Sequence, residues 1–195
     1  MTDIADALAN PYGAWFAGLP PFCRRQPGEQ TVEPPDPLWQ NWKAAVARSF
    51  AWAVPTEEAI GLIAKAASRV IEIGAGSGYW AWMLRQAGVD ILAFDTGPAA
   101  ISWHPVLRGD ASAAAYYQDR ALFLCWPPYG TGMATTALET YRGNLLIYVG
   151  EWRLGCGEPA LFDAIERDWS WVAGAALPNW RGRYDAVAIF RRNPA

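Results

Sequence analysis

A short apolar run that ends in three closely spaced glycines constrains the fold of this chain more than any other feature. Residues 70–78 read VIEIGAGSG, so Gly74, Gly76 and Gly78 follow directly on a candidate buried strand. Glycines after such a strand let the backbone turn tightly and approach a ligand that a side chain would exclude. The segment therefore predicts a strand, a ligand-binding loop and then a helix over about residues 78–86.

The spacing of the glycines indicates which type of ligand a loop of this kind binds. A dinucleotide-binding fingerprint needs its third glycine at position 79, where Tyr79 stands. A phosphate-binding loop needs a lysine after its last glycine, and no lysine follows Gly78. The sequence therefore disfavours both of these loop types.

Beyond the loop, apolar runs alternate with segments of helical period. The expected elements are strands at residues 89–95, 120–125 and 144–150, and helices at residues 133–141 and 158–169. This alternation indicates an α/β domain with a mainly parallel sheet that is wound right-handed. The closing segment, residues 184–192, alternates apolar and polar side chains, which suits an antiparallel strand at the edge of the sheet.

The first 37 residues are rich in proline, which excludes a long regular element. Aromatic residues between the prolines indicate that part of this arm packs. Tyr12, Trp15 and Phe16, together with Trp52, are candidates for a lid over a pocket, and simple packing explains them equally well. From Pro37 the sequence predicts a helix with one apolar stripe, formed by Trp39, Trp42, Val46 and Phe50.

A further helix is predicted after Thr56, because threonine is a good N-cap and two acidic residues occupy the first turn. It would bury Ile60, Ile63 and Ala66. We therefore expect residues 1–55 to form an arm and helix that cover the site, and residues 56–195 to form the α/β domain. Together they would make a single structural domain, since 195 residues can build one substantial core.

Composition limits the possible partners. The net charge is −3 and the pI about 5.2, which supplies no electrostatic reason to expect nucleic acid. Charged residues make up 18%, below the usual quarter, and there are 12 tryptophans. Low charge and many tryptophans indicate apolar surface that a ligand or a second subunit covers, so a homodimer is one expectation.

Metal binding and membrane insertion are not expected. The three cysteines lie far apart and the single histidine, His104, cannot complete a Cys/His cage. The N-terminal segment lacks the features of a signal peptide, and no apolar run is long enough to span a membrane. We therefore expect a soluble, cytoplasmic protein.

The glycine loop and two later segments together resemble a known family. Residues 72–78, with an acid before the glycines, resemble the first motif of the class I S-adenosylmethionine (SAM) methyltransferases. Asp95 ends the second strand, where that family places the acid that binds the ribose hydroxyls. Residues 109–111, Gly-Asp-Ala, resemble the third motif, whose acid or amide binds the adenine amino group. The resemblance covers residues 50–192 and looks like a little-characterised bacterial and fungal branch with a Trp-Pro-Pro-Tyr loop.

The resemblance implies a fold, a cofactor and a set of binding residues. The fold would be a doubly wound, mainly parallel seven-stranded sheet of order 3-2-1-4-5-7-6 with the last strand antiparallel, and the cofactor would be SAM. Glu72 would sit behind the glycine loop, either ordering it or reaching the ligand's ammonium through water. For Asp110, capping of the following helix is an alternative role. The residues expected at the cofactor are Trp52, Glu72, Gly74, Ala75, Gly76, Gly78, Tyr79, Asp95, Thr96, Gly109, Asp110, Ala111 and Trp126.

The loop at residues 126–129, Trp-Pro-Pro-Tyr, resembles the catalytic loop of members that methylate amino groups, which begins with Asn or Asp. In those enzymes the first side chain and the carbonyl between the prolines accept hydrogen bonds from the target amine. Trp126 stands at that position here, and an indole donates but cannot accept a hydrogen bond. Adenine or glutamine methylation by that mechanism is therefore disfavoured. Trp126 could instead attract a sulfonium or ammonium ion, and Tyr129 could stack on a substrate; the alternative is that both are core aromatics.

Glu151 directly follows the strand at residues 144–150, at the edge of the sheet where ligands bind in open α/β folds. It is a candidate general base or ammonium anchor, and a solvent-facing acid is the alternative. The catalytic candidates are thus Glu151, Tyr129 and Trp126, with no metal.

The favoured function is in-line methyl transfer from SAM to a small molecule with an amine, carboxylate or hydroxyl acceptor. Two alternatives stay open. One is an enzyme that transfers or cyclises the aminocarboxypropyl group of SAM, and the other is a non-catalytic subunit that binds a partner protein.

Overall fold

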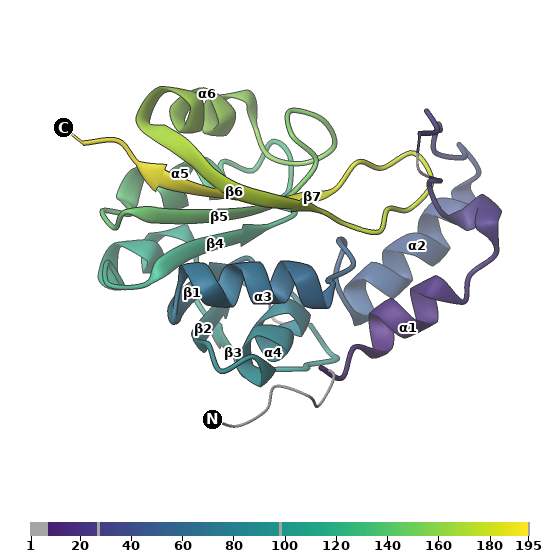
Figure 1. Ribbon diagram of the computed structural model, residues 1–195, viewed down its shortest axis with the longest axis horizontal. Coiled ribbons are helices and arrows are strands. Elements are labelled where there is room, and N and C mark those ends of the chain that lie inside the picture. Colours follow the sequence, from purple (N-terminus) through teal and green to yellow (C-terminus); the bar gives the residue numbers. More distant parts are fainter. Residues whose placement is uncertain (1–7, 27, 98, 195) are drawn as a thin grey trace.

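The computed structural model describes residues 8–26, 28–97 and 99–194, so the first seven residues of the predicted arm lie outside the described residues. Seven strands form one sheet in the order β3-β2-β1-β4-β5-β7-β6 (Figure 1). The strands are β1 (Arg69–Ile73), β2 (Asp90–Asp95), β3 (Val106–Arg108), β4 (Ala121–Cys125), β5 (Leu145–Gly150), β6 (Trp169–Ala176) and β7 (Ala186–Arg192). The first five strands are mutually parallel and β7 runs antiparallel to both of its neighbours, which confirms the expected strand order.

The register places the glycine loop between two neighbouring strand ends. Ile73, the last residue of β1, pairs with Phe94 of β2 on one side and with Leu124 of β4 on the other. Because these strands are parallel, the segments that follow them emerge at the same edge of the sheet. The glycine loop, Asp95 and the Trp-Pro-Pro-Tyr loop are therefore neighbours in space.

Helices cover both faces of the sheet. They are α1 (Pro11–Ala17), α2 (Pro37–Ser49), α3 (Glu57–Ala66), α4 (Tyr79–Gln86), α5 (Met133–Thr140) and α6 (Pro159–Asp168), with short 3₁₀ turns η1 (Pro21–Cys23) and η2 (Ala111–Tyr116). Buried side chains of α1, α3 and α4 share one core cluster with one face of the sheet. Those of η2, α5 and α6 share a second cluster with the other face. Figure 1 shows these two layers on either side of the strands.

Local sequence signals account for the helix starts. Thr56 caps α3, since its hydroxyl accepts a hydrogen bond of 3.1 Å from the backbone N–H of Ala59. Ile60 and Ile63 are fully buried as expected. Ala66 is exposed, contrary to the prediction, because it is the last helical residue and lies beyond the sheet contact.

The end of the chain differs from the sequence prediction. Residues 169–176 form the strand β6, which sequence reasoning missed, and the prediction of an edge position for the final strand is wrong. β7 lies between β5 and β6, and its residues Val187 and Ile189 are buried. The edge position belongs to β6, whose middle residues Trp171 and Val172 are exposed.

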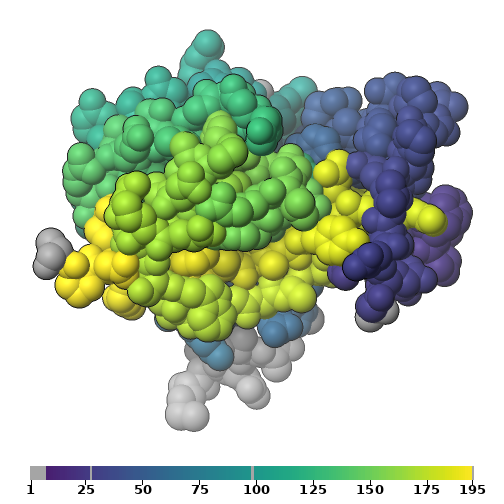
Figure 2. Space-filling view, turned by 90° about the horizontal axis from the view of Figure 1, so that it is seen from above, coloured from purple at the N-terminus to yellow at the C-terminus, as the bar shows by residue number. Residues whose placement is uncertain are grey.

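The arm packs against the connection between β6 and β7. Backbone hydrogen bonds join Arg25 to Asn179 at 2.8 Å and Arg181 to Cys23 at 2.9 Å. Figure 2 shows the purple and blue arm lying against the yellow segment that precedes β7. Tyr12 is fully buried in the core cluster of that side, where its ring stacks on Phe50 at 4.8 Å between centroids.

Within the described residues, no helix combines the length and the apolar character that crossing a membrane requires.

Candidate SAM-binding site

A cavity of about 1000 Å³ opens at the carboxyl edge of the parallel strands. That volume is at the upper end of the ~300–1,000 Å³ range of small-molecule sites. Eleven of the thirteen residues expected at the cofactor line it: Trp52, Glu72, Gly74, Ala75, Gly76, Asp95, Thr96, Gly109, Asp110, Ala111 and Trp126. Further lining residues come from the end of α2 and the segment that follows it, from the segment after β2, and from the loop between β4 and α5 with the first turn of α5.

The glycine loop needs its glycines for two different reasons. Gly74, Gly76 and Gly78 all have positive φ, at 79°, 55° and 72°, a region that side chains disfavour. A Cβ on Gly78 would also lie 3.0 Å from Cγ2 of Val106, so this glycine permits close packing. A Cβ on Gly76 would meet nothing within 4 Å, because that residue faces the cavity.

Asp95 fastens the glycine loop to the segment after β2. Its Oδ2 accepts a hydrogen bond of 2.9 Å from the N–H of Gly76, and its Oδ1 accepts one of 2.8 Å from Gly97. A carboxylate has about four acceptor positions, so each oxygen retains a free lone pair. The side chain is only half-buried and lines the cavity, which leaves those lone pairs available to hydroxyl donors.

Glu72 lies deeper in the same wall. It is 2% exposed, and its Oε2 has no hydrogen-bond partner among the described residues. Burial, with a smaller contribution from the negative charge of Asp95, raises the pKa of Glu72 to about 8. A buried carboxyl with one free oxygen at a cavity wall fits a ligand that brings a positive charge or hydrogen-bond donors.

Gly78 and Tyr79 lie outside the cavity lining. The ring of Tyr79 is buried toward the arm, where its hydroxyl donates to Oδ1 of Asn10 at 2.9 Å and accepts from the N–H of Tyr12 at 3.0 Å. Tyr79 therefore joins α4 to the arm. It faces away from the cavity because the first turn of α4 directs it to the arm side of the sheet.

Asp110 has the geometry of both roles considered for it. Its Oδ1 accepts hydrogen bonds from the N–H of Ser112 at 2.9 Å and from the Ser112 hydroxyl at 2.6 Å, so it caps η2. These hydrogen bonds lower the pKa of Asp110. The residue also lines the cavity, so capping and ligand contact are compatible.

Trp126 is held in place by three side chains. Its φ is 50°, a left-handed conformation that is costly for a bulky residue. The indole Nε1 donates a 2.6 Å hydrogen bond to Oδ1 of Asp185, and the ring stacks on Trp52 at 5.3 Å between centroids. The guanidinium carbon of Arg183 lies 5.3 Å from the ring centroid. Trp126 thus forms a fixed wall of the cavity together with Trp52.

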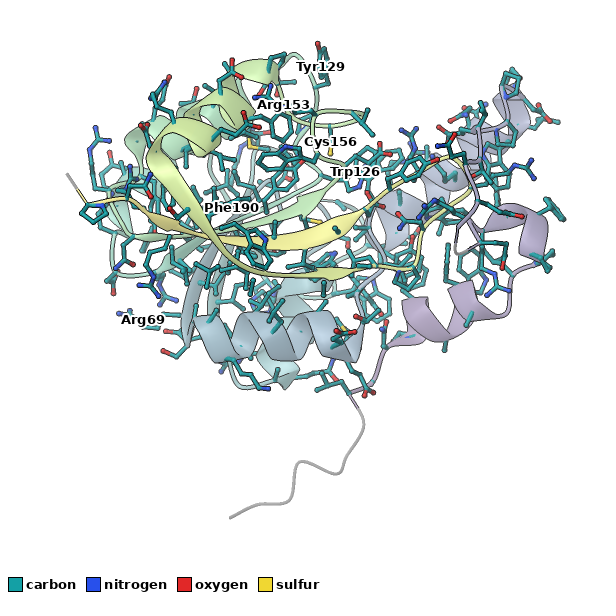
Figure 3. The ribbon with its side chains drawn as sticks, turned by 45° about the horizontal axis from the view of Figure 1, so that its top comes forward. Arg69, Trp126, Tyr129, Arg153, Cys156 and Phe190 are labelled. Atoms are coloured by element: carbon teal, nitrogen blue, oxygen red, sulfur yellow. The ribbon has the colours of Figure 1, made fainter. Side chains whose placement is uncertain are left out.

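Tyr129 and Glu151 are not brought into the cavity. Tyr129 is 64% exposed and stands at the periphery of the molecule in Figure 3, whereas Trp126 lies close to the strand ends. Glu151 is 2% exposed and outside the cavity lining. Its Oε1 accepts from the N–H of Tyr184 at 3.0 Å, and its Oε2 accepts from Arg183 Nη1 at 3.1 Å and Gly155 N–H at 3.2 Å. Glu151 therefore ties the loop after β5 to the segment before β7.

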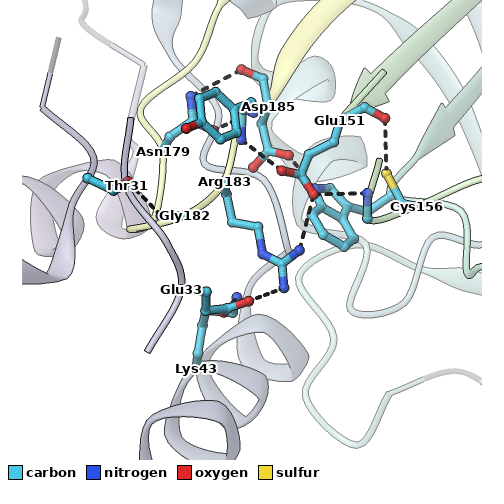
Figure 4. Close-up of polar contacts among 12 residues, drawn as sticks. Thr31, Glu33, Lys43, Glu151, Cys156, Asn179, Gly182, Arg183 and Asp185 are labelled. Atoms are coloured by element: carbon cyan, nitrogen blue, oxygen red, sulfur yellow. Dashed lines mark hydrogen bonds and ion pairs between the residues drawn. The ribbon is translucent and has the colours of Figure 1, made fainter. Parts of the chain in front are cut away.

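Sequence reasoning missed a cluster of charged side chains next to Trp126. Figure 4 shows Arg183, Asp185, Glu151, Glu33 and Lys43 of this cluster. Arg183 bridges Glu151 and Glu33 of the arm, and Glu33 also pairs with the buried Lys43. Asp185 is 3% exposed, and its Oδ2 has no hydrogen-bond partner among the described residues. Burial raises the pKa of Asp185 to about 7, and the Trp126 hydrogen bond opposes that rise.

One signal could have located Asp185. It immediately precedes β7, and the amino end of an antiparallel strand lies at the same edge as the carboxyl ends of its parallel neighbours. Among the other unpredicted lining residues, Arg48 and its neighbours come from the end of α2. Their approach to the glycine loop is a tertiary contact, in which the Ser77 hydroxyl donates to the carbonyl of Phe50.

Comparison with known proteins agrees with this geometry. No family model matches the sequence. A curated relative, ribosomal RNA large subunit methyltransferase M from Alkalilimnicola ehrlichii (strain ATCC BAA-1101 / DSM 17681 / MLHE-1), is 30% identical over 180 residues. The match covers 82% of this chain, and this chain spans 46% of the length of that relative. The strand order and the glycine loop with its two acids have the arrangement expected from the resemblance to the class I SAM-dependent methyltransferases, and the relative is itself named as a methyltransferase.

Two solved methyltransferase structures are among those similar to this chain. The 1,6-didemethyltoxoflavin-N1-methyltransferase of Burkholderia thailandensis, with bound 1,6-didemethyltoxoflavin and S-adenosylhomocysteine, is 15% identical with a TM-score of 0.49. The comparison covers 88% of this chain and 99% of that one. The N-methyltransferase NodS of Bradyrhizobium japonicum WM9, in complex with S-adenosylhomocysteine, is 13% identical with a TM-score of 0.48, covering 82% and 90% of the two chains.

Proposed function

We propose that this protein binds SAM in the cavity at the carboxyl edge of the sheet and transfers its methyl group to a small molecule. The observation that carries the proposal is the pair of acids Glu72 and Asp95, which come from the adjacent strands β1 and β2 and line the cavity together with the open residue Gly76. The free lone pairs of the Asp95 carboxylate suit a pair of ribose hydroxyls. The free oxygen of Glu72 suits the ammonium group of the methionine part, directly or through water.

The cofactor, when bound, supplies a methyl group activated by the sulfonium. The protein's contribution is to position the acceptor in line with that group and to exclude water. Trp52 and Trp126 supply a stacked aromatic wall for this purpose, and Phe50 and Met133 add apolar surface. Glu151 acts here as a positioning residue, because its oxygens already accept hydrogen bonds from Tyr184, Arg183 and Gly155.

The acceptor class has two candidates. A small molecule fits a cavity with aromatic walls and a chain of net charge −3. An RNA acceptor is the second candidate, since the curated relative is named as a ribosomal RNA methyltransferase. Incubation with radiolabelled SAM, followed by separation of macromolecular from small-molecule products, distinguishes the two.

Calorimetric titration tests cofactor binding. We expect SAM and S-adenosylhomocysteine to bind the wild-type protein, and Asp95→Ala to weaken binding roughly tenfold or more, the cost of losing hydrogen bonds to a charged group. Asp119→Ala is a matched control, because Asp119 is an exposed acid that pairs with Arg69 at the opposite edge of the sheet. Failure of the wild type to bind, or equal loss in both variants, would contradict the proposal.

Product analysis tests the reaction. Methyl transfer leaves S-adenosylhomocysteine, whereas attack on the aminocarboxypropyl chain leaves methylthioadenosine. Mass spectrometry of the nucleoside product therefore separates the proposed reaction from its enzymatic alternative. Binding without any turnover over a broad panel of acceptors would favour a non-catalytic subunit.

A further inference from the structure

The charges that line the cavity are unevenly placed. Three carboxyls, those of Glu72, Asp95 and Asp110, come from the strands and from the loops that follow them. The positive charge in the lining belongs to Arg48, in the last turn of α2. The cavity therefore presents acids along the sheet and a guanidinium on the helix that covers it.

Arg48 has its hydrogen-bonding capacity available. The side chain is exposed, and it takes part in none of the ion pairs or side-chain hydrogen bonds found among the described residues. Arg183 differs in that two carboxylates already occupy it. A guanidinium carries five N–H donors in a planar fork that matches a carboxylate in two parallel hydrogen bonds.

The segment that follows Arg48 in the chain adds apolar side chains to the cavity lining. Phe50 and Trp52 lie in this segment, and Trp52 stacks on Trp126 with an interplanar angle of 23°. Two nearly parallel indoles that are already held by neighbours present apolar surface of fixed shape. An arginine beside such a surface fits a ligand with a planar apolar body and one anionic end.

We propose that the acceptor is a small, planar, apolar carboxylic acid, that Arg48 binds its carboxylate, and that this carboxylate is the group methylated. The inference rests on the proposed function and adds the substrate class to it. The apolar body lies against Trp52 and Trp126, and the guanidinium orients the carboxylate toward the glycine-loop end of the cavity.

The chemistry balances without any proton transfer. A carboxylate oxygen attacks the methyl carbon, a C–O bond forms, and the C–S bond breaks with its electron pair passing to sulfur. One negative and one positive charge become a neutral methyl ester and a neutral thioether. Carboxylates are ionised at neutral pH, so the nucleophile needs no base. The ester has lost the charge that paired with Arg48, which favours its release.

Titration of the protein loaded with S-adenosylhomocysteine tests the substrate class. The probes are benzoate, phenylacetate and indole-3-acetate, each compared with its neutral amide. We expect each acid to bind roughly ten- to a hundredfold more tightly than its amide, the range for a charge-assisted hydrogen-bonded pair. Arg48→Met should abolish this preference. Arg85→Met should retain it, because Arg85 is also an exposed arginine in the last turn of a helix but lies outside the cavity lining.

A second measurement determines whether Arg48 binds the carboxylate of the acceptor or that of the cofactor. Arg48→Met should leave the affinity for S-adenosylhomocysteine, relative to that for methylthioadenosine, within about twofold of wild type. A selective loss of S-adenosylhomocysteine binding would assign Arg48 to the cofactor and overturn the inference. So would equal binding of acids and amides, a preference that survives Arg48→Met, or no binding of any acid at millimolar concentration.

Turnover provides the final readout. With SAM and the tightest-binding acid, we expect a methyl ester and S-adenosylhomocysteine in equal amounts, and methylation at another position would overturn the inference. Failure of the proposed function is distinguishable, because in that case S-adenosylhomocysteine does not bind the wild-type protein at all.

Discussion

The indole nitrogen of Trp126 donates a 2.6 Å hydrogen bond to the carboxylate of Asp185, which joins the loop after β4 to the residue that precedes β7. The hydrogen bond explains how a tryptophan occupies a position with φ of 50°. A strained backbone persists only where its surroundings over-determine it, and here Asp185, Trp52 and Arg183 all restrain the same side chain.

Removal of the Asp185 carboxylate should destabilise the protein through Trp126. We expect Asp185→Ala to lower the free energy of unfolding by about 1–3 kcal/mol, the cost of leaving a buried donor unsatisfied. In a double-mutant cycle measured by urea denaturation, Trp126→Phe should recover part of that loss, because phenylalanine has no N–H to leave unpaired. Strictly additive effects of the two substitutions would show that the hydrogen bond contributes nothing.

The stability of the ligand-free protein should fall as pH rises from about 4 to about 8. Glu72 and Asp185 have pKa values of about 8 and about 7, above the value of about 4 in an unfolded chain. Between the unfolded and the folded pKa, each carboxyl holds a proton in the folded state that it has lost in the unfolded chain. The stabilisation from each group is therefore complete below about pH 4 and is lost as the pH rises through its folded pKa. The expected slope is about 1.4 kcal/mol per pH unit for each group.

Denaturation at a series of pH values measures that slope. Glu72→Gln should remove that group's share of the fall in unfolding free energy with pH, up to about pH 8. Asp185→Asn should remove the share of Asp185, up to about pH 7. Glu139→Gln is the control, because Glu139 is an exposed glutamate on α5. An unchanged slope in both buried-site variants would mean that neither carboxyl is protonated in the folded state near neutral pH.

Cofactor binding should release a proton from Glu72. At pH 7 this carboxyl is mostly protonated in the ligand-free protein, because its pKa is about 8. An ammonium group beside it favours the ionised form, so up to about one proton should leave when SAM binds. Calorimetry in two buffers of different ionisation enthalpy measures this number. Equal apparent enthalpies in the two buffers for the wild type, or a release that persists in Glu72→Gln, would contradict the expectation.

A methyl group at Gly76 should block the ligand without preventing folding. Gly76 has φ of 55° and faces open space, so Gly76→Ala should cost about 1 kcal/mol of stability from backbone strain and abolish S-adenosylhomocysteine binding. Gly88→Ala is a matched control, since Gly88 has φ of 83°, also faces open space and lies outside the cavity lining. Similar thermal stability with binding lost only in Gly76→Ala is the expected result. Retained binding in Gly76→Ala would exclude the loop as the ligand's support.

Local pattern was sufficient to place the glycine loop, the acids Glu72 and Asp95, and most strands and helices. The carboxyl ends of successive parallel strands meet at one edge, so residues that follow such strands are brought together by topology alone. The edge position predicted for the final strand was wrong. Alternating apolar and polar side chains indicate that the two faces of a strand differ in polarity, but they do not indicate which strands lie beside it in the sheet.

The sequence by itself thus indicated an α/β fold class, because that depends on local periodicity, and the resemblance of its motifs to a known family supplied the expected strand order and cofactor residues. Only the tertiary structure decided that Asp185 holds Trp126, that Glu151 is occupied by Arg183 and backbone N–H groups, and that Arg48 reaches the cavity. Those outcomes depend on the position of β7 between β5 and β6 and on the packing that brings the end of α2 to the cavity. Both are set by the packing of segments far apart in the chain, for which no short sequence pattern carries the information.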